Sequence, residues 1–352
     1  MLRKAERNIT LLLTRTMATM HTKHTSVENL IAKSRREMAL KHMALKTEKS
    51  YIGWAKRYAY WLIKNPKGTT EEKINGFLSY LANEKNVAVN TQSQALNAIV
   101  WIYKNVLNMS VGDIGLFTRA RKARRLPTVL SQTQAIELIR NLTGVHWLIG
   151  SILYGSGLRL NECLSLRVQD IDFDRHQIMI RNGKGSKDRV VMLPAPLINP
   201  IKEKIEAARR IHRRDLIDGF GEVYLPHALE RKIGMACKEF KWQYIFQSTK
   251  ISVDPRSGVL RRHHLHDSAV SKALRAAAKF AAIDKRVTAH TLRHSFATHL
   301  IERGVNITTV QELMGHTDIR TTQIYIHVAQ NAATSITSPL EQPNITYLSK
   351  TG

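Results

Sequence analysis

Apolar side chains recur every three or four residues along much of the chain, which is the spacing of one face of an α-helix. In the first third of the chain this spacing predicts helices over residues 34–65, 70–84 and 90–107. One face of the first helix carries four aromatic residues, Tyr51, Trp54, Tyr58 and Trp61. We interpret this stripe as core packing, with base stacking as the alternative. Residues 26–113 are therefore expected to form a small, basic, all-helical domain.

The rest of the chain combines two patterns. Helical spacing covers residues 131–165, where Ser131 is placed to cap the first helix. Three shorter segments then alternate apolar and polar positions, residues 168–174, 177–181 and 189–193. A glycine-rich stretch separates the last two, so we expect a meander of three short strands with a hairpin. Two further helices are expected over residues 289–303 and 308–314, and they end at Gly304 and Gly315. A third is expected to begin after Asp318. The predicted fold class is mainly α with a small antiparallel β-sheet.

Composition and charge narrow the class of partner. The 352 residues carry a net charge of +26, which favours an acidic partner, and nucleic acid is the first candidate. A membrane surface is the second, but no apolar run approaches the roughly 18 residues that a spanning helix needs. Two cysteines, Cys163 and Cys237, suggest neither a disulfide framework nor a zinc site and so favour a reducing cytosol. Residues 1–25 form an N-terminal extension, interpreted as an organelle presequence or as the product of an upstream start codon.

A basic segment separates the two halves. Five cations fall within seven residues and are followed by Pro127: Arg119, Arg121, Lys122, Arg124 and Arg125. We interpret residues 114–130 as an extended linker that lies against phosphates, because a basic strap between two basic domains suits that role. A solvated charge run is the alternative.

Five residues suggest the chemistry. They are Arg159, far upstream, and a C-terminal group of His290, Arg293, His316 and Tyr325. Arginines can hold and neutralise phosphate oxygens, histidines can donate protons or hydrogen bonds, and a tyrosine can supply an oxygen nucleophile. This set suits cleavage of a phosphodiester without a metal or any other cofactor. Tyrosine has a pKa near 10 in water, so nearby positive charge would have to assist it.

The ordered motifs G-S-G-L-R-L-N-E, G-K-G, H-T-L-R-H, L-M-G-H and Tyr325 make the chain resemble the tyrosine recombinases, the integrase family of site-specific DNA recombinases. The resemblance implies a helical, SAM-like core-binding domain and a mixed α/β catalytic domain, residues 131–335, that clamp DNA from opposite faces. It implies that Arg159 and Arg293 bind the scissile phosphate and that Tyr325 attacks it to form a 3′-phosphotyrosyl link.

The same resemblance implies roles for the remaining polar residues. Lys184 would protonate the leaving 5′ oxygen, and Lys187 is its rival for that role. His290 would assist proton transfer at the tyrosine, and His316 would hydrogen-bond the phosphate. Glu162 would orient Arg159 without touching the substrate.

An insertion over about residues 200–268 distinguishes the chain from the simplest tyrosine recombinases. Three aromatic residues, Phe240, Trp242 and Tyr244, alternate with polar ones at the start of the segment that runs to Ser248, which predicts a strand with one packing or stacking face. The run Arg261, Arg262, His263, His264 suggests contact with phosphates or bases. Metal binding by His263, His264, His266 and Asp267 is an alternative, although the spacing matches no metal site that we can justify.

This insertion and the linker resemble those of integron integrases. The resemblance implies that Trp242, Pro255, His263 and His264 pack on bases extruded from a folded single-stranded attachment site. Gln247 stands where that family would have a proline. The implied activity is exchange of gene cassettes, by a homotetramer on DNA with both duplex and folded single-stranded sites, in the bacterial cytoplasm and associated with the nucleoid. The segment after Tyr325 would dock on a neighbouring subunit, and residues 336–352 would form the C-terminal tail.

Three other interpretations remain open. A phage or transposon integrase is disfavoured by the insertion, and a type IB topoisomerase shares the chemistry but lacks this insertion. A catalytically silent DNA-binding protein is the alternative of a different class, and the filled catalytic positions argue against it.

Overall fold

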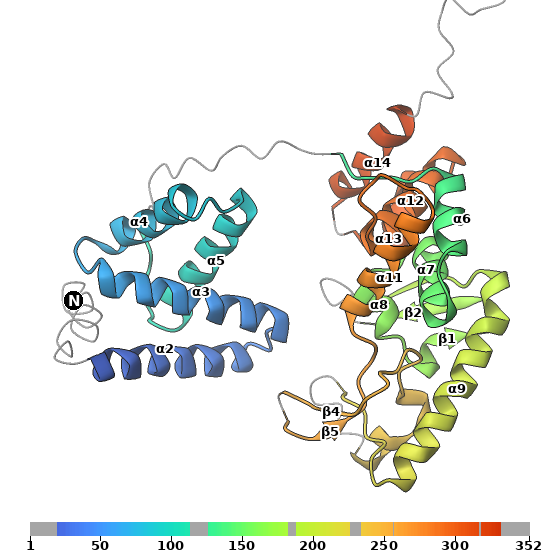
Figure 1. The fold of residues 1–352 in the computed structure, drawn as a ribbon, viewed down its shortest axis with the longest axis horizontal. Coiled ribbons are helices and arrows are strands. Elements are labelled where there is room, and N and C mark those ends of the chain that lie inside the picture. Colours follow the sequence, from blue (N-terminus) through green and yellow to red (C-terminus); the bar gives the residue numbers. More distant parts are fainter. Residues whose placement is uncertain are drawn as a thin grey trace, which may run out of the picture. The chain divides into compact units, whose positions relative to one another are not determined.

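The computed structural model describes residues 20–112, 126–181, 188–225, 234–255, 257–316 and 318–331. These residues belong to two compact units, Met1–Arg124 and Arg125–Gly352, which we describe separately (Figure 1). Of the helices within the described ranges, none has both the length and the apolar character that crossing a bilayer requires.

Within residues 20–112, the N-terminal unit contains four helices, α2 (Met20–Leu40), α3 (Leu45–Lys64), α4 (Thr70–Asn83) and α5 (Val89–Asn105). The single helix predicted over residues 34–65 is wrong, because the chain divides it into α2 and α3. At the end of α2, His42 adopts a left-handed φ of 50° and the amide of Met43 donates to the carbonyl of Met38 at 3.0 Å. That bond closes the helix in a Schellman-type turn, which no glycine marks in the sequence.

The aromatic stripe of α3 lies in the core of this unit. Trp54 and Tyr58 are buried, and the ring of Tyr58 lies 5.2 Å from that of Phe77 on α4. The hydroxyl groups of Tyr58 and Tyr103 are 3.2 Å apart, which joins α3 to α5. The interpretation of the stripe as core packing is confirmed for Trp54 and Tyr58.

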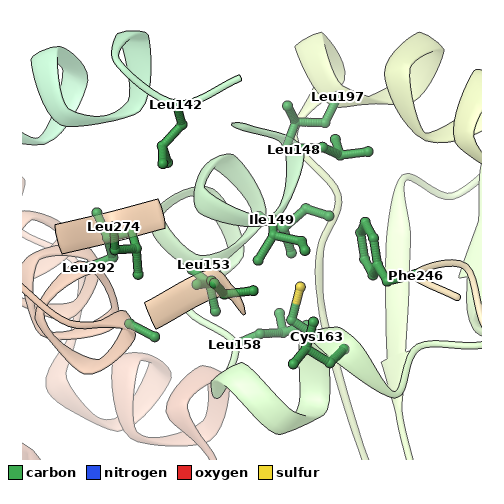
Figure 2. Packing of buried hydrophobic residues seen from close by; sticks show 14 of the residues in the cluster. Leu142, Leu148, Ile149, Leu153, Leu158, Cys163, Leu197, Phe246, Leu274 and Leu292 are labelled. Carbon is green, nitrogen blue, oxygen red and sulfur yellow. The ribbon is translucent and has the colours of Figure 1, made fainter. Parts of the chain in front are cut away.

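The core of the C-terminal unit is built around α7 (Gly144–Ser156), which follows α6 (Gln132–Arg140) and precedes α8 (Leu160–Leu164). Ser131 caps α6 as predicted, because its hydroxyl accepts from the amide of Gln134. Leucine and isoleucine side chains of α7 are buried on several sides, so other elements surround this helix (Figure 2).

A three-stranded antiparallel sheet lies against this core, as the alternating pattern predicts. After the 3₁₀ turn η1 (Val168–Asp170) come β1 (Ile171–Asp172), β2 (Gln177–Ile180) and β3 (Arg189–Met192), in the order β1-β2-β3. Ile178 stands opposite Ile171 on one side and Val191 on the other, and Ile178 and Val191 are buried. The register therefore turns one apolar face of the sheet toward α7 and α8.

The insertion begins with η2 (Ala195–Leu197) and the long helix α9 (Ile198–Ile217), drawn in yellow along one side of this unit (Figure 1). It continues through the 3₁₀ turns η3 (Gly234–Lys238) and η4 (Phe240–Trp242) and the paired strands β4 (Ser252–Val253) and β5 (Leu260–Arg261).

The strand predicted between Phe240 and Ser248 is wrong. Its first three residues form η4, and the rest makes only isolated bridges, at Tyr244 and Gln247. Tyr244, Ile245 and Phe246 are buried in succession, so both faces of this segment are covered. A strand with one packing face would instead alternate buried and exposed positions.

The described part of the unit ends with four helices, α11 (Asp267–Phe280), α12 (Ala289–Glu302), α13 (Ile307–Met314) and α14 (Arg320–Asn331). The last three agree with the helices predicted near the C-terminus, including the left-handed glycines Gly304 and Gly315 that follow α12 and α13. Helix α12 packs against both α7 and α14, and most of its side chains are buried. This packing places residues of α12 and α14 next to the start of α8.

Candidate active site

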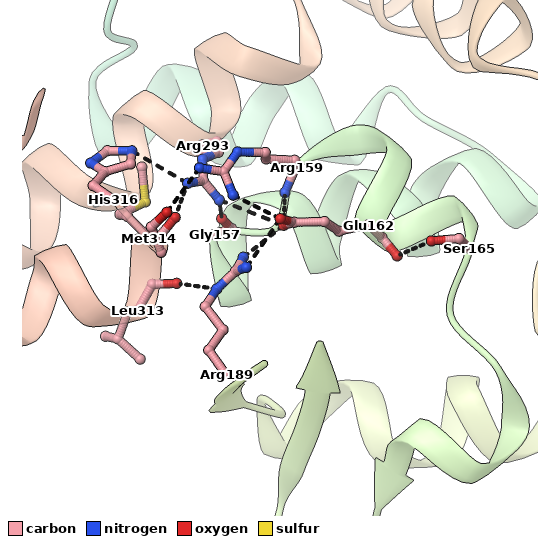
Figure 3. Close-up of polar contacts among 10 residues, drawn as sticks. Gly157, Arg159, Glu162, Ser165, Arg189, Arg293, Leu313, Met314 and His316 are labelled. Atoms are coloured by element: carbon pink, nitrogen blue, oxygen red, sulfur yellow. Dashed lines mark hydrogen bonds and ion pairs between the residues drawn. The ribbon is translucent and has the colours of Figure 1, made fainter. Parts of the chain in front are cut away.

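The carboxylate of Glu162 lies at the centre of an arginine cluster (Figure 3). It accepts from the backbone amide of Arg159 at 2.8 Å and from Nη1 of the same residue at 2.7 Å. Burial by itself would raise the pKa of Glu162, but hydrogen bonds from Arg189 and Arg159 outweigh it and hold that pKa at about 2. Glu162 is therefore ionised at neutral pH, and it fixes Arg159 at the start of α8.

Arg293 is held between two carbonyl groups. Its side chain projects from α12, is only 3% exposed, and donates to the carbonyl oxygens of Gly157 and Met314. Gly157 closes α7 with a φ of 66°, and a Cβ there would lie 2.4 Å from the ring of Phe296, so glycine is required. Burial and the nearby Arg159 lower the pKa of Arg293 to about 9, which leaves it charged at neutral pH.

His316 follows α13 and joins this cluster. Its Nε2 lies 3.4 Å from Nη2 of Arg293, and its Nδ1 lies 2.9 Å from the hydroxyl of Thr322 on α14. Burial and the charges of Arg293 and Arg159 lower the pKa of His316 to about 4. The imidazole is therefore neutral at pH 7, and because a guanidinium can only donate, Nε2 accepts from Arg293 while Nδ1–H faces Thr322 in this arrangement.

Tyr325 lies on α14 against His316, with ring centroids 6.3 Å apart and nearly parallel planes. Its side chain is 1% exposed, and burial raises its pKa to about 12 despite the opposing charges of Arg293 and Arg159. The hydroxyl group therefore keeps its proton at neutral pH in this arrangement.

His294, which was not among the predicted site residues, contacts the tyrosine hydroxyl. Its Nδ1 lies 2.7 Å from the hydroxyl oxygen of Tyr325, and burial, with the neighbouring His290, lowers the pKa of His294 to about 4. His290 was predicted to assist proton transfer at the tyrosine, but among the described residues no hydrogen bond joins it to Tyr325. His290 is exposed, and its ring lies 6.2 Å from that of His294. The signal for His294 was its position four residues after His290, on the same helical face.

Arg189 is the second residue that sequence reasoning missed. It begins β3, its side chain is only 10% exposed, and it donates to both carboxylate oxygens of Glu162, at 2.6 and 3.0 Å. The alternating pattern predicted a strand at this position, but nothing in that pattern distinguishes this arginine from a surface cation.

Six of the predicted site residues lie outside the described residues. They are the general-acid candidate and the linker cations, namely Lys184, Arg119, Arg121, Lys122, Arg124 and Arg125. Lys187, the rival of Lys184, also lies outside them.

The predicted residues of the insertion fall into two groups. Arg261 is 3% exposed, and Arg262 forms a bidentate ion pair with Asp215 at 2.6 Å for each bond, so both face the interior of the unit. Pro255 is exposed and His263 is partly exposed, and Nε2 of His263 lies 3.6 Å from Asp254. The structure thus separates the run Arg261–His264 into two internal arginines and two more accessible histidines.

A hollow of about 310 Å³ lies between the insertion and the sheet. Trp242 and Tyr244 line it together with Glu162, Arg167 and Arg181. The indole Nε1 of Trp242 is buried and has no hydrogen-bond partner among the residues that the structure describes. His264 contacts the ring of Tyr244 edge-on, with centroids 5.3 Å apart. In the same described ranges, no group of three or more histidine, cysteine or acidic side chains is arranged to hold a metal ion.

Comparison with known proteins gives matches over both units. Residues 128–332 match the model of the phage integrase family, and residues 30–113 match the N-terminal SAM-like domain of phage integrases. An integrase/recombinase of Escherichia coli is 42% identical over 301 residues, 85% of this chain and 89% of that protein. Tyrosine recombinase XerA of Thermococcus onnurineus is 32% identical over 280 residues, 77% of this chain and 83% of that protein.

Two solved structures share the fold. The XerH site-specific recombinase, bound to its difH substrate before cleavage, matches with a TM-score of 0.57 and 19% identity over 94% of this chain and 93% of that one. The Tn1549 transposon integrase, in complex with transposon right end DNA, matches with a TM-score of 0.55 and 15% identity over 86% of this chain and 97% of that one.

Proposed function

Because this chain belongs to the phage integrase family of tyrosine recombinases, we propose that the cluster around Glu162 binds the scissile phosphate of DNA and that Tyr325 cuts the strand. The family makes the protein a site-specific recombinase, and the roles of individual residues are our proposal. The observation that carries it is the local charge. Three guanidiniums surround one carboxylate beside a buried tyrosine, which leaves an excess of positive charge for a phosphate to balance.

In the proposed reaction, the hydroxyl of Tyr325 gives its proton to the imidazole of His294, its oxygen attacks phosphorus, and the bond to the 5′ oxygen breaks. Arg159 and Arg293 would neutralise the non-bridging oxygens, and His316, once the phosphate replaces it as the partner of Arg293, would turn an N–H of its ring to one of these oxygens. Lys184 would give its proton to the leaving 5′ oxygen. A 5′-hydroxyl of a partner strand then gives its proton to Lys184 and attacks the 3′-phosphotyrosine, and the bond from phosphorus to the oxygen of Tyr325 breaks as that oxygen takes its proton back from His294. One phosphodiester replaces another, so the exchange needs no energy source.

The tyrosine must change its surroundings before it reacts. Tyr325 is buried and protonated in the described arrangement, so a phosphate cannot reach its oxygen. We infer that α14 shifts when DNA binds, which would expose the hydroxyl to the substrate. A tail exchanged between subunits of a homotetramer would supply such a shift, and it would keep cleavage dependent on assembly.

The insertion supports the finer proposal of an integron integrase. Trp242 and His264 stand beside aromatic and cationic side chains, and the indole N–H has no acceptor among the residues that the structure describes. An extruded base offers a π-face and hydrogen-bond acceptors, and stacking on an aromatic side chain contributes about 1–3 kcal/mol per base. We propose that Trp242, Pro255, His263 and His264 bind extruded bases of a folded single-stranded site. Arg261 and Arg262 would support them from inside the unit.

The test uses a labelled single-stranded hairpin site and its duplex form, incubated with the protein in EDTA and analysed under denaturing conditions. We expect a covalent protein–DNA band with the hairpin, and its loss in Tyr325→Phe. Tyr154→Phe is the matched control, because Tyr154 also pairs with a histidine of α12, at 2.9 Å, away from the cluster. A band with the duplex alone would favour a phage or transposon type of integrase. Binding without any band would favour a silent DNA-binding protein.

A further inference from the structure

Three guanidiniums hold the C-terminal end of α13, each on one of three consecutive carbonyl groups. The acceptors are, in chain order, the carbonyl oxygens of Leu313, Met314 and Gly315. The donors are, in the same order, Arg189, Arg293 and Arg159. The carbonyl end of a helix carries partial negative charge, so it attracts cations. Because the donors come from β3, α12 and the start of α8, the end of α13 is fixed from three elements.

Arg189 is the one of these three that has no role in the reaction proposed above. Its Nε donates to the carbonyl of Leu313 at 3.0 Å, while its two terminal nitrogens donate to the carboxylate of Glu162. Its side chain is 10% exposed and that of Glu162 12%. One guanidinium therefore ties the carboxylate to α13, and such a fork is a geometry that only arginine provides.

The backbone next to His316 is shaped around Arg189. Gly315 has a φ of 57°, and a Cβ there would lie 3.0 Å from both Cδ and Nη1 of Arg189. Glycine thus serves two purposes at this position, since it adopts the left-handed conformation and leaves room for the guanidinium. Any displacement of Arg189 would therefore change the packing against Gly315, the residue that directly precedes His316.

The charge balance explains why a third arginine is needed. Nη1 of Arg159 lies 2.7 Å from Glu162, and Nη1 of Arg293 lies 3.9 Å from it. Without Arg189, the full charge of the carboxylate would fall on these two residues. Positive charge that is taken up by Glu162 is not available to a phosphate.

We propose that Arg189 is a positioning residue, which occupies Glu162 and α13 so that Arg159, Arg293 and His316 present their charge and hydrogen bonds to the phosphate. The inference rests on the proposed function. Arg189 acts through these neighbours and does not itself touch the substrate.

The test compares covalent-adduct rates on two substrates, one with an ordinary scissile phosphodiester and one with a neutral methylphosphonate at that position. We expect Arg189→Met to lower the rate on the phosphodiester about 100-fold relative to wild type, the size of loss that misplaced catalytic groups cause. On the methylphosphonate the loss should be less than about 10-fold, because that substrate carries less charge to be neutralised. The Arg189→Lys variant keeps the charge but not the fork, so its rate on the phosphodiester should lie between those of wild type and Arg189→Met. Arg140→Met, at an exposed arginine paired with Glu137, is the matched control.

Equal losses on both substrates, or no loss, would overturn the proposal. If Arg189→Met does not fold, as judged by thermal melting, Arg189→Lys takes its place in the comparison. A double variant gives a second measure, since Arg189→Met in a Glu162→Gln background should cost less than about 10-fold if the two residues act together. A full loss in that background would also overturn the proposal. Failure of the proposed function is distinguishable, because wild type would then form no adduct on either substrate.

Discussion

The imidazole of His294 and the hydroxyl of Tyr325 share a hydrogen bond, with 2.7 Å between Nδ1 and the hydroxyl oxygen. The pKa of the histidine is about 4 and that of the tyrosine about 12, so the proton stays on the tyrosine and the imidazole accepts. In this state His294 therefore holds the tyrosine in place, and deprotonation of the tyrosine requires the change in surroundings inferred above.

Replacement of His294 should consequently impair strand cleavage without abolishing it. We expect His294→Ala to slow formation of the covalent adduct about 100-fold, as is typical when a residue that handles a reacting proton is lost. His294→Gln should recover part of the rate, because its amide oxygen can also accept from Tyr325. His299→Gln is the control, since it alters the corresponding contact with Tyr154. An unchanged rate in His294→Ala would exclude a part for His294 in cleavage.

The general acid can be identified with a leaving group that needs no proton. The Lys184→Ala variant should not cleave an ordinary site. It should still cleave a site whose 5′ bridging oxygen is replaced by sulfur, because a thiolate leaves without protonation. The Lys187→Ala variant should cleave the ordinary site within about 10-fold of wild type, since a lysine that does not transfer the proton contributes mainly general charge. Sulfur rescue of Lys187→Ala, and not of Lys184→Ala, would reverse the assignment of the two lysines.

Trp242→Ala should distinguish folded single strands from duplex DNA. Loss of one stacked base is expected to weaken hairpin binding by about 1–3 kcal/mol and to leave duplex binding nearly unchanged. Lys241→Ala removes a neighbouring exposed charge, and it should weaken binding to both substrates equally. Titrations at one fixed salt concentration provide the measurement. Equal losses for Trp242→Ala would contradict the role in extruded-base binding.

Stability should depend on pH through the buried histidines. The pKa of His294 and that of His316 are lowered to about 4 in the folded protein, against an ordinary value near 6.5. The unfolded chain binds more protons between these values, so the free energy of unfolding is at its full value above pH 6.5 and declines as pH falls toward 4. Urea unfolding from pH 7 to 4 should show this decline, and His294→Gln should reduce its slope. A slope that His294→Gln leaves unaltered would mean that other groups cause it.

The ion pair between Arg262 and Asp215 should stabilise the insertion. Both side chains are largely buried, and removal of one partner leaves the other charge unpaired. We expect Arg262→Met to lower the free energy of unfolding by about 3–5 kcal/mol. Thermal melting in the absence of DNA tests this, with Arg175→Met, at an exposed surface pair, as the control. A melting temperature that does not change in Arg262→Met would restore the interpretation of Arg262 as a residue that contacts DNA.

Periodicity predicted most elements because their signals are local. The strands of the meander, the helices near the C-terminus and the cap at Ser131 each depend on residues a few positions apart. The break between α2 and α3 was missed because a histidine, not a glycine, takes the left-handed position. The segment after Phe240 was misjudged because burial on both of its faces depends on distant parts of the chain.

The candidate site was predictable to a similar degree. Arg159, Glu162, Arg293, His316 and Tyr325 lie together in the structure, as the ordered motifs suggested. The two residues missed, Arg189 and His294, have roles that follow from contacts across 27 and 31 positions of the chain. A pattern along the sequence cannot show which cation meets Glu162 or which imidazole reaches the tyrosine.

The two arginines that border the connection between β2 and β3 have a consequence for engineering. Arg181 pairs with Asp170 at 2.8 Å before residues 182–187, and Arg189 pairs with Glu162 after them. Each end of this connection is thus attached to the frame of the unit by its own ion pair. We expect the sheet to keep its register when the residues between them are replaced by other sequences, while cleavage of an ordinary site is lost in any replacement that removes Lys184.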